Sequence, residues 1–115
     1  MKVIVAGSRI IDDKKLVWDS IDKSKFNITT LISGGAIGVD ILAEDWAKAH
    51  KIPILQYKPH YSIYNPKEAP LLRNQDMARD GEALIAIWKD GTRGTEHMIN
   101  CMKKQNKPIE IIKVD

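Results

Sequence analysis

The chain passes from strand to helix through Ile32-Ser33-Gly34-Gly35-Ala36-Ile37-Gly38-Val39-Asp40, and the rest of the fold is predicted outward from this turn. The β-branched run 28–32 before it is typical of a buried strand, and the apolar residues of 39–49 recur at helical spacing. Three glycines in five residues separate the two segments and permit positive φ and close approach to the backbone. A helix N-terminus offers unpaired N–H groups and partial positive charge. The loop is therefore a candidate phosphate cradle.

A plain turn is the alternative interpretation of these glycines. Their spacing, G-G-x-x-G, matches neither the dinucleotide pattern G-x-G-x-x-G nor the P-loop pattern G-x-x-x-x-G-K-[ST]. Glycines that serve only the geometry of a tight connection between strand and helix would give the same sequence. The loop alone does not decide between these two interpretations.

Size and composition indicate a single soluble domain. The chain has 115 residues and a formal net charge of +3, carried by scattered basic residues, which favours a solvated surface over a dedicated nucleic-acid interface. Its single cysteine, Cys101, excludes an internal disulfide and a multi-cysteine zinc site, and it fits a reducing compartment. No apolar run reaches the ~20 residues of a membrane span, and residues 1–6 are too short for the apolar core of a signal peptide. We expect a cytoplasmic protein with no membrane partner.

Strand and helix patterns alternate along the whole chain. Strands are predicted at 3–6, 28–32, 53–57, 82–88 and 109–114, and helices at 12–24 with Asp12 or Asp13 as N-cap, 39–49, 70–80 and 95–105. This rhythm is typical of an open parallel sheet with right-handed crossovers and helices on both faces. The predicted fold class is α/β: a single Rossmann-like three-layer sandwich with a five-stranded parallel sheet, spanning residues 1–115.

Loops that suit an anion follow three of these strands. Gly7-Ser8-Arg9 offers close backbone approach, a hydroxyl and a guanidinium, Gly34-Gly35 offers the turn described above, and 91–95 is a second glycine loop that leads into a helix. Thr92 and Thr95 suit a helix cap or a hydrogen bond to an anion. In parallel sheets, ligands bind beyond the carboxyl ends of the strands. Together these loops predict one site for a phosphate-bearing ligand.

The segment 58–70 loses all periodicity and is predicted to be a binding loop or lid. His60, Tyr61 and Tyr64 could stack on a base, although a loop held by its own aromatic side chains explains them equally well. The helix that follows has a weak apolar stripe and carries Arg73-Asn74 in its first turn. Polar residues at that place indicate function.

Four motifs in this order resemble the SLOG superfamily, and most closely its small YspA-type, cpYpsA-related branch. They are Val-Ala-Gly-Ser-Arg at 5–9, Gly-Gly-Ala-x-Gly-x-Asp at 34–40, Arg-Asn-x-x-Met at 73–77 and Arg-Gly-Thr at 93–95. Relatives include the Lonely Guy (LOG) phosphoribohydrolases and the DNA-processing protein DprA. The resemblance implies a Rossmann-like fold that binds nucleotides or nucleotide-derived ligands.

Matched position by position, the resemblance implies ligand-binding residues at each loop: Gly7, Ser8, Arg9, Gly34, Gly35, Asp40, Arg73, Asn74, Arg93, Gly94 and Thr95. Gly94 and Thr95 would hold phosphate, and Arg73 stands where LOG enzymes carry an arginine used in catalysis. Relatives of this branch also tend to have a tryptophan and Gly-Lys-x-Ala-Gly before the Arg-Asn pair, whereas this chain has Tyr61 and 65–70 without glycine.

The LOG catalytic signature is incomplete. Its glutamate lies three positions after the Gly-Thr threonine, where this chain has Met98. Glu96 follows Thr95 directly, and a shift of two residues on a helix turns a side chain by about 200°, to the opposite face. Glu96 is therefore not an assured substitute.

Three functions remain open, with a nucleotide-binding module or sensor first. The alternative is a LOG-like hydrolase that cleaves the N-glycosidic bond of a nucleoside 5′-monophosphate, with Arg73, Asp40 and Glu96 as catalytic candidates and Asp90 as a further carboxylate. The third is single-stranded nucleic-acid binding. No cofactor or metal site is expected, since His50, His60 and His97 are far apart in the sequence. Exposed faces of Trp18 or Trp46 could pair subunits in a homo-oligomer.

Overall fold

The computed structural model describes residues 1–89 and 92–114. Within these residues, strands and helices alternate as β1 (Lys2–Gly7), α1 (Lys14–Asp22), β2 (Thr30–Ser33), α2 (Val39–Ala49), β3 (Ile54–Gln56), α3 (Ala69–Asp80), β4 (Ala83–Lys89), α4 (Arg93–Lys104) and β5 (Ile109–Val114). All strand pairs are parallel. The α/β, Rossmann-like prediction is therefore confirmed.

The strand order places a crevice beside β1. The sheet runs β3-β2-β1-β4-β5, so the chain builds outward from β1 to β3 and then returns to β4 on the other side of β1. Parallel sheets of this kind bind ligands at the carboxyl ends of the strands where the order reverses. Here that point lies between β1 and β4.

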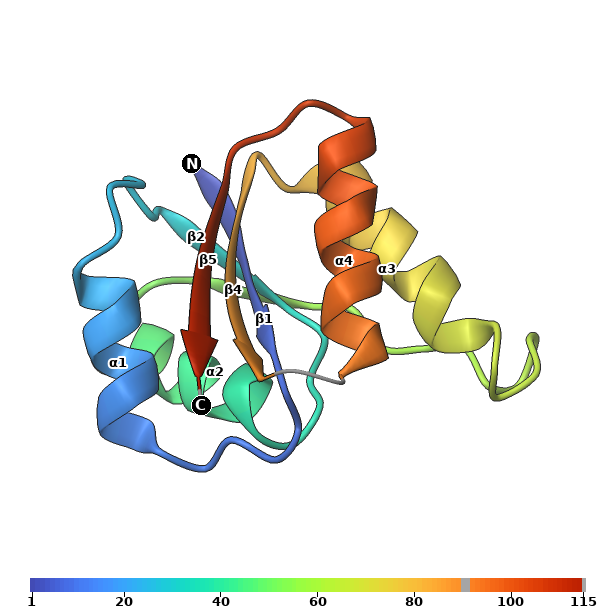
Figure 1. Ribbon diagram of the computed structural model, residues 1–115, viewed down its shortest axis with the longest axis horizontal. Helices are drawn as coiled ribbons and strands as arrows, with labels where there is room; N and C mark the ends of the chain where they lie inside the picture. Colours follow the sequence, from blue (N-terminus) through green and yellow to red (C-terminus); the bar gives the residue numbers. More distant parts are fainter. Residues whose placement is uncertain (90–91, 115) are drawn as a thin grey trace.

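The helices form two layers, one on each face of the sheet. Figure 1 shows α1 and α2 on one side of the strands and α3 and α4 on the other. Val3 and Val5 of β1 pack in the core cluster with α1 and α2, whereas Ile4 packs with α3 and α4. The alternation of side chains along a strand explains this division. Central strands are buried on both faces, which is why their sequences are continuously apolar.

Element ends depart from the sequence prediction by a few residues. Asp13 is the N-cap of α1, where its carboxylate accepts a hydrogen bond of 3.1 Å from Leu16 N–H. The last helix begins at Arg93, two residues earlier than predicted, and β2 begins at Thr30. The earlier start places the Gly94-Thr95 pair inside the first turn of α4.

Of the two tryptophans expected to have exposed faces, Trp46 is buried and Trp18 is half-buried. Trp46 is 6% exposed, because it packs in the core cluster of α1 and α2 and its indole N–H donates to Asp22 at 2.9 Å. An exposed pairing face at Trp46 is therefore wrong. Trp18 is half-buried, and its indole donates to the carbonyl of Leu42 at 3.0 Å.

Cys101 lies at the edge of the core, not within it. Its side chain is half-buried and packs against the cluster of α3 and α4. None of the described helices is both long and apolar enough to cross a membrane.

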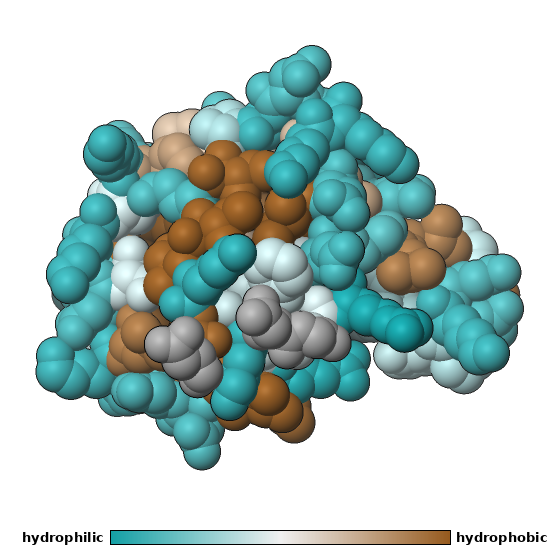
Figure 2. Space-filling view, in the orientation of Figure 1, coloured by the Kyte–Doolittle hydropathy of each residue, from teal (hydrophilic) through white to brown (hydrophobic). Residues whose placement is uncertain are grey.

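The edge strand β5 carries apolar side chains at the surface. Figure 2 shows them gathered where β5 runs in Figure 1, and Ile111 of this strand is 41% exposed. Its neighbour β4 carries Ile85, which is fully buried. The same side chain therefore occurs in a central and an edge strand of one sheet.

We expect Ile85→Ala to lower the free energy of unfolding by about 2–5 kcal/mol, because it leaves a cavity in the core. Ile111→Ala should cost less than about 1 kcal/mol, since its side chain already contacts water. Urea denaturation followed by circular dichroism measures both values. Equal losses in the two variants would contradict the assignment of the core.

Candidate functional site

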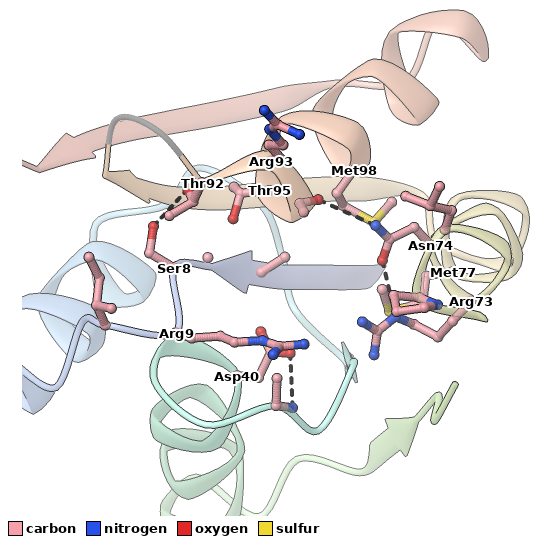
Figure 3. Close-up of a pocket in the computed structure, with 17 residues that line it drawn as sticks. Ser8, Arg9, Asp40, Arg73, Asn74, Met77, Thr92, Arg93, Thr95 and Met98 are labelled. Atoms are coloured by element: carbon pink, nitrogen blue, oxygen red, sulfur yellow. Dashed lines mark hydrogen bonds between the residues drawn. The ribbon is translucent and has the colours of Figure 1, made fainter. Parts of the chain in front are cut away.

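An inner cavity of about 260 Å³ opens where β1 and β4 end. Its polar lining comes from four segments: Ser8 and Arg9 after β1, Asp40 on α2, Arg73 and Asn74 on α3, and Thr92 to Thr95 at the start of α4. In Figure 3, Arg9 and Arg73 approach Asp40 from opposite sides, and Thr95 faces them across the cavity. Segments far apart in the sequence thus meet at the predicted edge of the sheet.

A larger outer cavity of about 510 Å³ adjoins the inner one. Its lining includes Gly34 and Gly35 of the glycine loop and Lys58 and Tyr61 of the segment after β3. Arg9, Ala36 and Arg73 line both cavities. The two cavities are therefore neighbours with a shared wall.

All eleven ligand-binding residues implied by the resemblance line one of these two cavities. Gly7, Ser8, Arg9, Asp40, Arg73, Asn74, Arg93, Gly94 and Thr95 line the inner cavity, and Gly34 and Gly35 line the outer one. Glu96 is exposed and lines neither. Asp90 and Gly91 lie outside the described residues. Arg93 borders the inner cavity, but in Figure 3 its guanidinium points away from Arg9 and Asp40.

At the start of α4, which lines the inner cavity, the N–H groups of Gly94 and Thr95 have no hydrogen-bond acceptor among the described residues. Thr92 is the N-cap, but its hydroxyl donates to Lys89 O at 2.9 Å and bonds Ser8 Oγ at 3.0 Å, so it does not cap the helix. A Cβ added at Gly94 would meet no atom within 4 Å, so the backbone there is open. Thr95 is buried, and no described residue hydrogen-bonds its hydroxyl. An anion fits such a terminus.

Ser8 holds the segment that leads into α4 through hydrogen bonds to Lys89 and Thr92. Its hydroxyl accepts from Lys89 N–H at 3.0 Å in addition to the Thr92 bond. Because the Thr92 proton goes to Lys89 O, the Ser8 proton goes to Thr92. Ser8 is fully buried and fixes the approach to α4, so its single proton is not available to a ligand in this arrangement.

The glycine loop before α2 differs from the start of α4, because nearby side chains already accept hydrogen bonds from two of its amides. Gly35 N–H donates to Ser33 Oγ at 3.1 Å, and Ala36 N–H donates to Asp40 Oδ2 at 3.2 Å. Asp40 lies in the first turn of α2, where a carboxylate complements the helix dipole. A phosphate at this loop would have to compete with the Asp40 carboxylate.

Gly38 accounts for the sharp turn in the same loop. Its φ is +85°, and a Cβ there would lie 2.6 Å from the carbonyl oxygens of Ser8 and Arg9. Only glycine fits both the backbone conformation and the space. The plain-turn interpretation therefore explains Gly38 and, through its φ of +72°, Gly35 as well, although Gly34 and Gly35 also line the outer cavity.

Asp40 combines burial with two nearby cations. It is 7% exposed, and this burial raises the pKa of its carboxyl to about 6, against the lowering effects of the Ala36 N–H, Arg73 and Arg9. The effect of burial is the largest, because a carboxylate removed from water loses more hydration free energy than its interactions with these partners restore. Around pH 6 the cavity thus holds a carboxyl of which a substantial fraction is protonated.

Arg73 is held by three acceptors from three segments. Its Nη1 donates to Gly34 O at 2.8 Å and to Tyr57 O at 3.2 Å, and its Nε donates to Asn74 Oδ1 at 3.1 Å. Burial lowers the pKa of this guanidinium, although an arginine remains charged. Nη2 has no partner among the described residues, so it is left to face the cavities.

Asn74 links Arg73 to α4. Since its Oδ1 accepts from Arg73, its Nδ2 is the donor to Gly94 O at 3.3 Å and to His97 Nδ1 at 3.1 Å. His97 Nδ1 must then be unprotonated, in keeping with a pKa that burial lowers. The side chain of Asn74 therefore sets the position of the arginine relative to the open helix terminus.

The sequence patterns did not predict two further groups of residues at the site. Glu44 of α2 is buried beneath the glycine loop, where it accepts from Ser33 Oγ at 2.7 Å and from Gln56 Nε2 at 3.0 Å. Ser33 and Gln56 pair in register at the ends of β2 and β3, which is the signal for this contact. Lys58 lies just beyond the carboxyl end of β3, so the rule that identified Arg9 would also have identified it.

No group of three or more potential metal ligands occurs in residues 1–89 and 92–114. Two of the three histidines have structural partners elsewhere: His50 stacks on Trp46, and His97 hydrogen-bonds with Asn74.

Comparison with known proteins places the chain in a described group. The model of the YspA, cpYpsA-related SLOG family matches residues 1–64, which is more than half of the chain. The chain is also similar to the Gene 61 protein of Mycobacterium phage D29, with 29% identity over 115 aligned residues that cover 92% of this chain and 89% of that protein. The family match contains Arg9 and Asp40, while the roles of Arg73 and α4 rest on the geometry above.

We expect Asp40 to make the stability depend on pH. Its folded-state pKa of about 6 lies above the ordinary value of 3.8, so the folded protein holds this proton more tightly than the unfolded chain. Ionisation therefore lowers the free energy of unfolding as the pH rises from about 4 to 6. The stability of the wild type relative to Asp40→Asn should fall across this window by up to about 3 kcal/mol.

Urea denaturation between pH 4 and pH 7 measures this difference. Asp12→Asn, at an exposed carboxyl before α1, is the matched control and should leave the profile parallel to that of the wild type. A parallel profile for Asp40→Asn as well would contradict the buried, proton-binding state of Asp40.

Proposed function

Because the chain belongs to the YspA, cpYpsA-related SLOG family, we propose that it binds a nucleotide or nucleotide-derived ligand through its phosphate and acts as a binding module or sensor. The observation that carries the proposal is the inner cavity, where an open helix N-terminus faces two guanidinium groups. The ligand would lie at the carboxyl ends of β1 and β4.

Phosphate recognition would draw on both sides of this cavity. The N–H groups of Gly94 and Thr95 and the Thr95 hydroxyl are donors on one side, and Arg9 and Nη2 of Arg73 are donors on the other. Charge-assisted hydrogen bonds contribute roughly 1.5–3 kcal/mol each. Two or three of them supply about 3–9 kcal/mol, so micromolar affinity, about 8 kcal/mol, also requires contacts of the sugar and base that offset the cost of ordering the ligand.

Asp40 suits the sugar rather than the phosphate. Its carboxyl lies in the same cavity as the donors, and an ionised carboxylate accepts hydrogen bonds from ribose hydroxyls. Arg9 and Arg73 favour its ionised form and offset part of the effect of burial. We therefore assign Asp40 to the ribose and the α4 terminus to the phosphate.

Asp40 also supports a second candidate, the LOG-like hydrolase. Cleavage of an N-glycosidic bond needs a carboxyl that can exchange a proton or stabilise positive charge on the sugar, and a buried carboxyl with a pKa of about 6 has this capacity. Glu96 lies outside both cavities, so Asp40 would have to act without it. Arg73 would hold the phosphate during such a reaction.

Isothermal titration calorimetry with the four nucleoside 5′-monophosphates tests the binding function. We expect at least one to bind with a micromolar dissociation constant, and Arg9→Gln to weaken that binding at least tenfold through loss of a charge-assisted contact. Lys48→Gln removes a positive charge from the far end of α2 and should leave the affinity unchanged. Absence of binding by all four nucleotides would contradict the proposal.

The same mixtures, analysed by chromatography for free base, separate the sensor from the hydrolase. Tight binding without release of base supports the sensor. Release that Asp40→Asn abolishes while binding persists supports the hydrolase instead.

A further inference from the structure

Resting on the nucleotide-binding function proposed above, we infer that the ligand carries two phosphate groups on one nucleoside. One phosphate lies at the N-terminus of α4 in the inner cavity, and the other lies in the outer cavity beside Arg9, Lys58 and Arg73. The site would then select doubly phosphorylated nucleosides over monophosphates.

The volumes of the two cavities favour a ligand that spans both. Sites for small molecules usually measure roughly 300–1,000 Å³. The inner cavity, at about 260 Å³, falls below this range, while the outer cavity measures about 510 Å³. Since Arg9, Ala36 and Arg73 line both, a ligand anchored at α4 would extend past them into the outer space.

The charged residues that line the outer cavity favour the binding of an anion. Its lining includes the three cations Arg9, Lys58 and Arg73 and contains no aspartate or glutamate. Among the described residues, neither Arg9 nor Lys58 forms an ion pair. Asp40 of the inner cavity is the carboxyl near two of them, so a neutral base would leave an excess of positive charge, whereas a phosphate would neutralise it and accept hydrogen bonds from these cations.

The inner cavity, by contrast, already contains a carboxyl. Asp40 lines it and receives the Ala36 N–H, so the glycine loop has an internal anion. The open donors of the inner cavity are those of Gly94 and Thr95, on the opposite wall. The two positions available to phosphate are therefore separate, one at α4 and one beyond the arginines.

The contacts of Arg73 allow it to serve both positions. Gly34 O, Tyr57 O and Asn74 Oδ1 occupy Nη1 and Nε, which fixes the plane of the guanidinium between the cavities. Lys58 differs, because it lines the outer cavity only. Lys58 is therefore the residue that distinguishes a second phosphate from the first.

A base stacked on Tyr61 is the competing occupant of the outer cavity. Tyr61 is exposed there, beside Pro59 and Ile37. Stacking would make affinity depend on Tyr61 and not on Lys58. The two occupants thus predict opposite effects for two variants of the same loop.

The experiment compares mono- and diphosphorylated forms of whichever nucleoside binds best as its 5′-monophosphate, by calorimetry on the full chain. We expect the 5′-diphosphate or the 3′,5′-bisphosphate to bind at least tenfold more tightly than the monophosphate, and the better of the two identifies the placement of the second phosphate. Lys58→Gln should abolish this gain and leave the monophosphate affinity within twofold. Lys67→Gln, an exposed lysine of the same loop that lines neither cavity, should change nothing.

Equal affinity for all three forms, or a gain that survives Lys58→Gln, would overturn the inference while leaving nucleotide binding intact. Loss of affinity for every form in Tyr61→Ala, with no effect of Lys58→Gln, would assign the outer cavity to the base instead. If no nucleotide bound at all, the underlying function itself would fail.

Discussion

The guanidinium of Arg73 holds the candidate site together. It ties α3 to the carbonyls of Gly34 and Tyr57, which directly follow β2 and β3, and through Asn74 it is linked to α4. These elements lie on opposite sides of the crevice at the carboxyl edge of the sheet. Arg73 is half-buried and its three hydrogen-bond acceptors are neutral, so no partner carboxylate neutralises its charge directly. The network that orders the crevice therefore also makes it attractive to an anion.

The two helix N-termini at this crevice have different roles. That of α2 is complemented by its own Asp40, which accepts the Ala36 N–H and so occupies the place that an anion would take. That of α4 has a hydroxyl N-cap turned toward Ser8 and Lys89, and a glycine in its first turn leaves the backbone open. An anion is therefore expected at α4, even though the glycine-rich sequence lies before α2. The glycines of that loop serve the turn at Gly38 and the close contact of Gly34 with Arg73.

The close contact at Gly34 shows how the turn and the site depend on each other. A Cβ at this position would lie 2.5 Å from Nη1 of Arg73 and 2.9 Å from Oδ2 of Asp40. The missing side chain thus leaves room for the arginine to reach the carbonyl of the same residue. The glycine loop contributes to anion binding through the arginine that it admits, in addition to its own lining of the outer cavity.

Sequence patterns predicted the sheet well, because strands buried on both faces must be apolar throughout, as in 82–88. They also predicted the edge at which Arg9, Arg73 and Thr95 meet, since parallel strands bring their carboxyl ends together. They did not predict which amides are occupied, because this depends on where the side chains of Ser33 and Asp40 point after folding. The burial of Trp46 was missed for a similar reason: its partner Asp22 lies on a different helix. Lys58 was not predicted because the anion-binding loops were identified by their glycines, and the loop after β3 contains none.

If the backbone amides of α4, and not those of the glycine loop, donate to phosphate, ¹H–¹⁵N NMR of the backbone amides during titration with inorganic phosphate should show it. We expect the Gly94 and Thr95 amides to shift most, because their N–H groups gain a charged acceptor. The Gly35 and Ala36 amides should shift less, even though they line the outer cavity, since they already donate to Ser33 and Asp40. Shifts concentrated at Gly35 and Ala36, with Gly94 and Thr95 unmoved, would show that the glycine loop binds the anion through its own amides instead.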